Sequence, residues 1–96
     1  MTGLEEFLAG IASDAGANAS SGGEFQRGGQ PYAAVSGNSA EFRLDPEIAE
    51  AALGTLSTSS SSRGAEWVRL TVNEDNPHDY DRARAWFLSA WRKAGG

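Results

Sequence analysis

The stretch G-N-S-A-E-F-R-L-D-P-E-I-A-E-A-A-L-G, residues 37–54, contains the signals for a turn, a strand and a complete helix. It opens with a Gly-Asn dipeptide, which is typical of a tight turn. Apolar and polar residues then alternate, with Ala40, Phe42 and Leu44 on one side, and this is the period of a half-buried strand. We therefore expect a strand that turns one face towards the core.

A short helix is expected directly after this strand, from Asp45 to about Leu53. Asp45 can cap the N-terminus by accepting from unpaired N–H groups, and Pro46 suits the first helical position, where no N–H is needed. Gly54 can end the helix in a left-handed conformation. The apolar positions recur at helical spacing and form one stripe, made of Ile48, Ala49, Ala52 and Leu53.

The rest of the chain predicts two more helices and three more strands. We expect the helices to span about 2–16 and 77–94, and the strands to span 24–27, 32–36 and 65–72. The resulting order is α-β-β-β-α-β-α within a single domain of residues 1–96. The predicted fold class is α+β: an antiparallel sheet of about four strands with helices mainly on one face.

The apolar stripes of these elements predict one core, made of Phe7, Ile11, Phe42, Leu44, Ile48, Leu53, Val68, Leu70 and Phe87. Trp86 and Leu88 widen the stripe of the last helix. We therefore expect this helix to be buried on two sides, by a second contact within the chain or by a dimer interface. The segment 55–62 is almost purely Ser and Thr, and we expect it to be mobile and replaceable.

The composition argues against several classes of function. The chain has 96 residues, no cysteine and a net charge of −5. The lack of cysteine excludes a disulfide framework and thiolate metal sites, and an acidic chain with a single lysine offers few contacts to DNA phosphates. No apolar run is long enough to span a bilayer, and the acidic N-terminus does not resemble a signal peptide. We expect a cytoplasmic protein without a cofactor that binds neither membranes nor duplex DNA.

The residues with catalytic or metal-binding chemistry do not assemble into a recognisable motif. His78, the single histidine, has acidic neighbours, but their order is not that of a calcium loop, and acidic residues also stabilise a helix N-terminus. The serines of 57–62 have no G-x-S-x-G turn and no evident base. The paired glycines at 22–23 and 28–29 match no phosphate-binding pattern and predict hairpin turns. We therefore expect no catalytic residues, no metal site and no enzyme.

Trp67 and Arg69 are the strongest binding candidates. If Val68, Leu70 and Val72 face the helices, strand parity puts Trp67 and Arg69 on the opposite face, with Arg43 on the equivalent face of its own strand. An outward tryptophan among arginines can stack on a ligand or a partner's side chain. The alternatives are that Trp67 is covered by its own chain or by a second subunit, and that Glu41 pairs with an arginine across the strands.

Three segments resemble small bacterial proteins akin to the MmcQ/YjbR family: AEFRLDPEIAEAAL (40–53), SSSSRGAEWVRL (59–70) and DRARAWFLSAWRKA (81–94). The resemblance covers roughly residues 32–94. Members of the YjbR group resemble a double-wing DNA-binding fold, so the resemblance implies DNA binding as an alternative function. This chain departs from that group in its acidic charge and in the lack of a basic wing in its Gly/Ser-rich first third.

The sequence therefore favours a non-enzymatic binding or accessory module, either monomeric or a homodimer, with a protein or small-molecule partner that the residues do not identify. The alternative, DNA binding, depends on the placement of four arginines. A cluster would favour it and a scattered arrangement would not. These four are Arg27, Arg43, Arg63 and Arg69.

Overall fold

The structure is a computed structural model that describes residues 3–16, 23–54, 58–61, 64, 66–73 and 75–95. These residues form three helices and five strands. The helices are α1 (Gly3–Ala15), α2 (Pro46–Leu53) and α3 (Pro77–Ala94), and the strands are β1 (Glu24–Arg27), β2 (Gln30–Ser36), β3 (Ser39–Arg43), β4 (Thr58–Ser60) and β5 (Trp67–Thr71). The predicted α+β class and order of elements are confirmed, with β4 as an additional strand.

All five strands lie in one antiparallel sheet of order β1-β2-β3-β5-β4. Tight turns join β1 to β2 and β2 to β3, as the Gly-rich dipeptides predict. Gly28, Gly29 and Gly37 have φ values of 62°, 81° and 60° in these turns. Glycine adopts such positive values without strain, and two-residue hairpin turns require them. The first three strands therefore form two consecutive hairpins.

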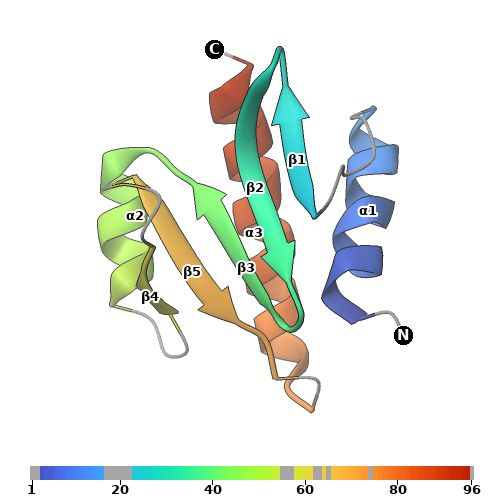
Figure 1. The fold of residues 1–96 in the computed structure, drawn as a ribbon. Coiled ribbons are helices and arrows are strands. Elements are labelled where there is room, and N and C mark those ends of the chain that lie inside the picture. Colours follow the sequence, from blue (N-terminus) through green and yellow to red (C-terminus); the bar gives the residue numbers. More distant parts are fainter. Residues whose placement is uncertain are drawn as a thin grey trace.

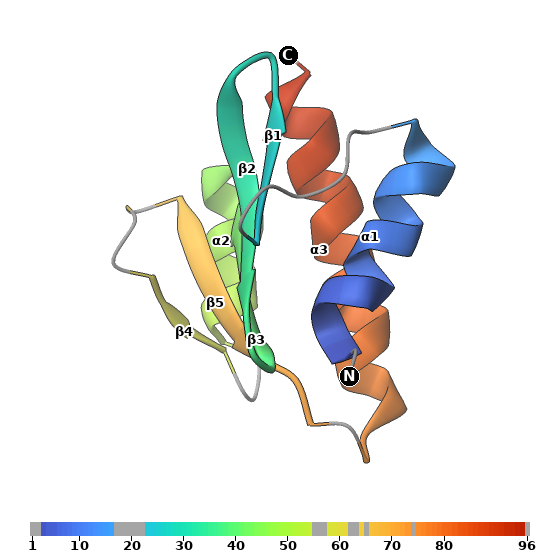
Figure 2. The ribbon, with the colours of Figure 1, turned by 45° about the vertical axis from the view of Figure 1, so that its right-hand side comes forward.

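The helices lie on one side of the sheet (Figure 1). α3 runs behind β2 and β3, α2 lies behind β4 and β5, and α1 packs beside α3, as the turned view in Figure 2 also shows. No described helix covers the other side, which we call the open face. None of the described helices combines the length and apolarity needed to cross a membrane.

The core lies between the sheet and these helices. The predicted core residues that are buried are Ile11, Phe42, Leu44, Val68, Leu70 and Phe87. Phe7 is half-buried, and its ring meets Tyr80 edge-on with the ring centroids 5.1 Å apart. Trp86, also half-buried, packs against Phe42 at 6.4 Å. α3 is thus covered on two sides by contacts within the chain, from the sheet and from α1.

The prediction that Ile48 and Leu53 lie in the core is wrong, because their side chains are 37% and 43% exposed. α2 instead packs through Ala49 and Ala52, which are both buried. Two small side chains three residues apart share one helix face and let the helix approach the sheet closely. The larger side chains of the stripe are consequently left on the flanks of α2.

Both ends of α2 also differ from the prediction. Asp45 occupies the N-cap but makes no side-chain cap bond, and its Oδ1 instead accepts from Lys93 Nζ at 3.2 Å. Gly54 has a φ of −82°, which is not left-handed, and its N–H donates to the carbonyl of Ala51 at 3.2 Å. Pairing with α3 therefore replaces the expected cap at the first end, and a backbone turn closes the second.

The Ser/Thr-rich segment contains a strand where mobility was expected. Thr58–Ser60 pairs with β5, with Thr58 opposite Leu70. The hydroxyl of Ser61 donates to the carboxylate of Glu41. The prediction of a mobile segment is wrong for residues 58–61, because β5 offers an open edge whose backbone groups even a polar strand can satisfy. The rest of the segment lies outside the described residues.

A bulge in β2 places two consecutive residues on the helix side of the sheet. Phe25 pairs with Ala33 and Gln26 pairs with Pro31, so Tyr32 is the extra residue. Tyr32 and Ala33 are both fully buried. An inserted residue shifts the alternation of a strand, which is why simple period-2 parity fails at this point.

The bulge leaves the phenol of Tyr32 in an apolar environment. The Tyr32 ring packs against Phe87 and Trp91, with centroid distances of 5.4 and 5.5 Å. Within the described part of the chain its hydroxyl has no hydrogen-bond partner. Burial raises the pKa of Tyr32 to about 12, and the charge of nearby Arg27 opposes part of that rise. A buried hydroxyl of this kind lowers stability and carries no evident binding role.

Candidate functional site

The open face carries a line of four side chains that register across neighbouring strands. Glu24 of β1 pairs with Ala34 of β2, Ala34 pairs with Glu41 of β3, and Glu41 pairs with Arg69 of β5. Directly opposed residues project to the same side of a sheet, about 5 Å apart. These four residues, which we call the charged row, therefore present acid, methyl, acid and base in that order.

A second line of side chains runs beside the charged row. Ser36 of β2 pairs with Ser39 of β3, which pairs with Thr71 of β5. The hydroxyls of Ser39 and Thr71 lie 3.3 Å apart and can share a hydrogen bond. Ser39 is buried in this hydroxyl row, so Ser36 and Thr71 are the residues that offer uncharged donors and acceptors at the face.

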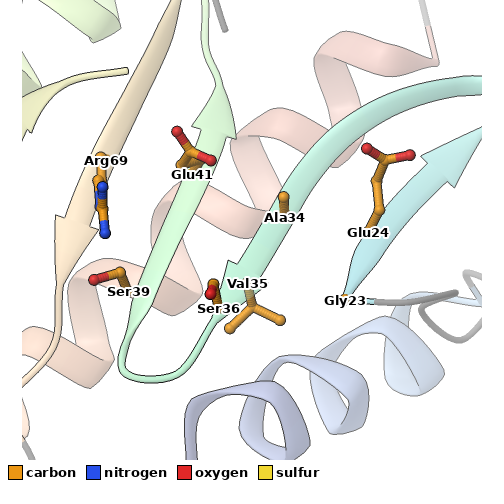
Figure 3. Close-up of a pocket in the computed structure, with 8 residues that line it drawn as sticks. All are labelled: Gly23, Glu24, Ala34, Val35, Ser36, Ser39, Glu41 and Arg69. Carbon is orange, nitrogen blue, oxygen red and sulfur yellow. The ribbon is translucent and has the colours of Figure 1, made fainter. Parts of the chain in front are cut away.

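The two rows enclose a hollow of about 380 Å³, shown in Figure 3. Its floor is made of small side chains, among them Ala34, Ser36 and Ser39, while the longer Glu24, Glu41 and Arg69 stand at its sides. Small residues between long ones on the same face create such a depression. The hollow is therefore a direct consequence of the sequence pattern on β2 and β3.

Trp67 is placed on the open face as strand parity predicts, but it is not available there. Its side chain is only 8% exposed. The backbone N–H of Trp67 donates to the carbonyl of Gly64 at 3.1 Å, and a side chain built at Gly64 would contact the indole at 3.5 Å. Gly64 thus lies against the indole of Trp67. Of the alternatives left open by the sequence, the structure favours the one in which Trp67 is covered by its own chain, so the indole is not exposed for stacking.

Arg43 and Arg69 share the open face but differ in their surroundings. Arg43 registers beside Trp67, and its Nε lies 3.3 Å from Oε1 of Glu66. Lys93 Nζ approaches the same oxygen at 3.7 Å. Arg69 is exposed and registers beside Glu41, and no ion pair or hydrogen bond to its guanidinium is found among the described residues. Arg69 is thus the better binding candidate of the two arginines.

Of the four arginines on which DNA binding depends, the three that are described have separate surroundings. Arg27 lies at the far end of β1, where its guanidinium covers the ring of Trp91 at 3.8 Å and its Nη1 donates to the Trp91 carbonyl at 2.9 Å. It therefore closes the C-terminus of α3. Arg43 is paired with Glu66, and Arg69 stands next to Glu41. Arg63 lies outside the described residues.

The polar residues around His78 stabilise the N-terminus of α3. The side chain of Asn76 accepts from the N–H of His78 at 3.0 Å and so caps the N-terminus of α3. Asp79 is buried; it accepts from the N–H of Asn73 at 3.0 Å and pairs with Arg82 at 3.0 Å. Among the described residues, no three His, Asp, Glu or Cys side chains are close enough to hold a metal ion.

A second hollow, of about 440 Å³, lies between α2 and the end of α3. It contains the exposed Ile48 together with Asp45, Ser89, Arg92 and Lys93. Lys93 is already paired with Asp45 at 3.2 Å and approaches Glu66 at 3.7 Å. Because these ion pairs engage its most buried cation, this hollow is a weaker candidate than the one on the open face.

Sequence reasoning identified Arg69 but missed Glu24 and the hollow. Glu24 belongs to a four-residue strand, and only the strand register shows that Ala34 separates it from Glu41. The sequence did contain one signal for the hollow, namely the small outward-facing residues of β2 and β3. Large side chains commonly cover a sheet face, so small ones indicate a depression. That signal cannot be used without the pairing of the strands.

No protein-family model, curated protein or solved structure matches this chain. The likeness to the MmcQ/YjbR family therefore stays a prediction from sequence segments.

Proposed function

We propose that this chain is a non-enzymatic binding or accessory module that meets its partner with the open face of its sheet. One observation carries the proposal: the helices cover one side of the sheet, and the other side holds a hollow lined by Glu24, Glu41 and Arg69. Charged side chains at fixed spacing on a rigid sheet can recognise a partner without large rearrangement.

The charges of the face favour a partner that carries charges of both signs. Two carboxylates and one guanidinium stand in one row, with hydroxyls beside them. Duplex DNA, the alternative, presents a uniformly negative backbone that needs several unpaired cations. Arg27 and Arg43 are engaged with Trp91 and Glu66, so these two arginines offer little to DNA phosphates. A protein surface or a small zwitterionic molecule suits the face better.

The test is a ligand screen against the chain and a matched pair of variants. Amino acids, nucleotides and other metabolites are screened by thermal shift, and hits are mapped by amide chemical shifts. Arg69→Ala removes the open-face cation, and Arg84→Ala removes an exposed arginine from α3. We expect a hit to shift amides of β2, β3 and β5 and to be lost in Arg69→Ala alone.

Two results would contradict the proposal. The first is a ligand whose binding survives Arg69→Ala and whose shifts map to the helices. The second is submicromolar, salt-sensitive binding of duplex DNA in an anisotropy assay, which would favour the alternative function.

A further inference from the structure

The order of charges along the charged row is complementary to its own reverse. Read from β1 to β5, the row presents Glu24, Ala34, Glu41 and Arg69. Read from β5 to β1, it presents base, acid, methyl and acid. When the row is superposed on its reverse, a base lies opposite an acid at both ends, and a methyl group lies opposite an acid at both inner positions.

A two-fold axis produces this superposition. When two copies face each other through their open faces, an axis along the strands reverses the strand order of the second copy. If the axis passes between β2 and β3, Glu24 of each copy lies opposite Arg69 of the other. Ala34 of each copy lies opposite Glu41 of the other, where its small side chain leaves room for the longer one.

The alternative orientation is disfavoured by charge. A two-fold axis perpendicular to the strands would place Glu24 opposite Glu24 and Arg69 opposite Arg69, and like charges in contact are destabilising. The axis along the strands also brings the exposed Ser36 opposite the buried Ser39 of the second copy, where neither side chain carries a charge that opposes the contact. Both rows of the open face are compatible with that orientation.

We propose that the partner of the open face is a second copy of this chain, related by the two-fold axis along the strands. This inference rests on the proposed function, because it names the occupant of the same face. The second copy satisfies Arg69 of one chain with Glu24 of the other. The contact has the symmetry of the commonest protein dimers.

The expected dimer is weak. Four strands about 5 Å apart, each contributing roughly five residues at about 3.4 Å, offer a flat area of roughly 300–350 Å². A standard stable interface buries about 800 Å² per partner. We therefore expect an equilibrium between monomer and dimer at micromolar to millimolar concentration, with strong dependence on salt, because exposed ion pairs are screened.

Sedimentation of the full chain tests the proposal. We expect the weight-average mass to rise from monomer towards dimer between about 20 µM and about 1 mM at low salt, and about 0.5 M NaCl to weaken association roughly tenfold. A chain that stays monomeric at about 1 mM and low salt overturns the dimer. That result leaves the proposed function standing, because the Arg69-dependent ligand screen addresses it separately.

Charge exchange tests the pairing itself. Arg69→Glu and Glu24→Arg should each weaken the dimer about tenfold or more, because each brings like charges together, while the double variant should recover to within about threefold of the original chain. Glu24→Gln should weaken it less. Arg84→Glu and Glu50→Arg make the same charge changes on exposed helix positions and should have no effect.

The outcomes separate clearly when the fold of each variant is checked by its thermal midpoint. Recovery in the double variant establishes that Glu24 and Arg69 meet across the axis. The proposed contact is overturned if both single variants associate as strongly as the original chain. It is also overturned if the double variant folds but its association does not recover.

Discussion

The two faces of the sheet carry very different side chains, although the same strands form both. Phe42 and Glu41 are neighbours on β3, as are Leu70 and Arg69 on β5, yet one of each pair is fully buried and the other projects from the open face. The helices supply the difference, since all three lie on one side. Along each of these strands, every second side chain thus points into the core, and the side chains between them carry charges on the open face.

The comparison teaches that stability and recognition can be separated residue by residue. The helix side is filled with aromatic and aliphatic side chains, such as Phe25, Phe87 and Val68. The open face is floored by small residues and edged by charged ones. Substitutions on the helix side should change the free energy of unfolding, and those on the open face should change association.

The largest effect is expected for Phe42→Ala. Phe42 is fully buried, and its ring packs against Trp86 at 6.4 Å. Removing it should lower the free energy of unfolding by about 3–5 kcal/mol, through lost burial and the cavity left behind. Urea unfolding measures this loss, with Thr71→Ala on the open face as the control. An unchanged denaturation midpoint would contradict the assignment of Phe42 to the core.

A smaller loss is expected for Asp79→Ala, which removes a buried polar anchor from the helix side. Asp79 accepts from the N–H of Asn73 and pairs with Arg82. The substitution leaves that N–H without its partner, and we expect a loss of about 2–3 kcal/mol in urea unfolding. Asp81→Ala, at an exposed position of the same helix, is the matched control and should change stability little. Equal effects of the two would contradict this role.

Tyr32→Phe should raise stability, by about 1 kcal/mol, because it removes a buried hydroxyl that has no partner in the described part of the chain. The pH dependence gives a second readout. The pKa of Tyr32 rises from 10.0 to about 12 on folding, so the folded state favours the protonated phenol. This contribution is constant below pH 10 and is lost as the pH rises through about 12.

Unfolding measured from neutral pH to alkaline pH compares the two chains. The original chain should lose more stability above pH 10 than Tyr32→Phe. Parallel pH profiles would show that the Tyr32 hydroxyl has a proton acceptor or solvent contact in the folded protein.

The sequence predicted the elements whose signals are local. The turns at Gly28-Gly29 and Gly37-Asn38, the helix start at Pro77 and the buried positions of β3 and β5 all follow from short patterns. It failed where tertiary packing decides. The buried face of α2 is formed by Ala49 and Ala52 and not by Ile48 and Leu53, because the smaller side chains allow closer packing against the sheet.

The candidate site was predicted only in part for a related reason. Parity placed Trp67 and Arg69 on one face, but parity does not show that the indole is buried beside Gly64. The charged row needs the register of β1, β2, β3 and β5, and the short β1 carries a weak sequence signal. Pairing between strands distant in sequence is set by the whole sheet and not by any one segment.

Two neighbours on β5 test the separation of the faces most directly. Leu70→Ala and Arg69→Ala are compared by urea unfolding and by sedimentation at the same concentrations. We expect Leu70→Ala to lose about 2–5 kcal/mol of stability, and Arg69→Ala to change it by less than about 0.5 kcal/mol while weakening self-association. An Arg69→Ala chain that is strongly destabilised would contradict the separation of the two faces, and one that associates as the original chain does would contradict the proposed dimer contact.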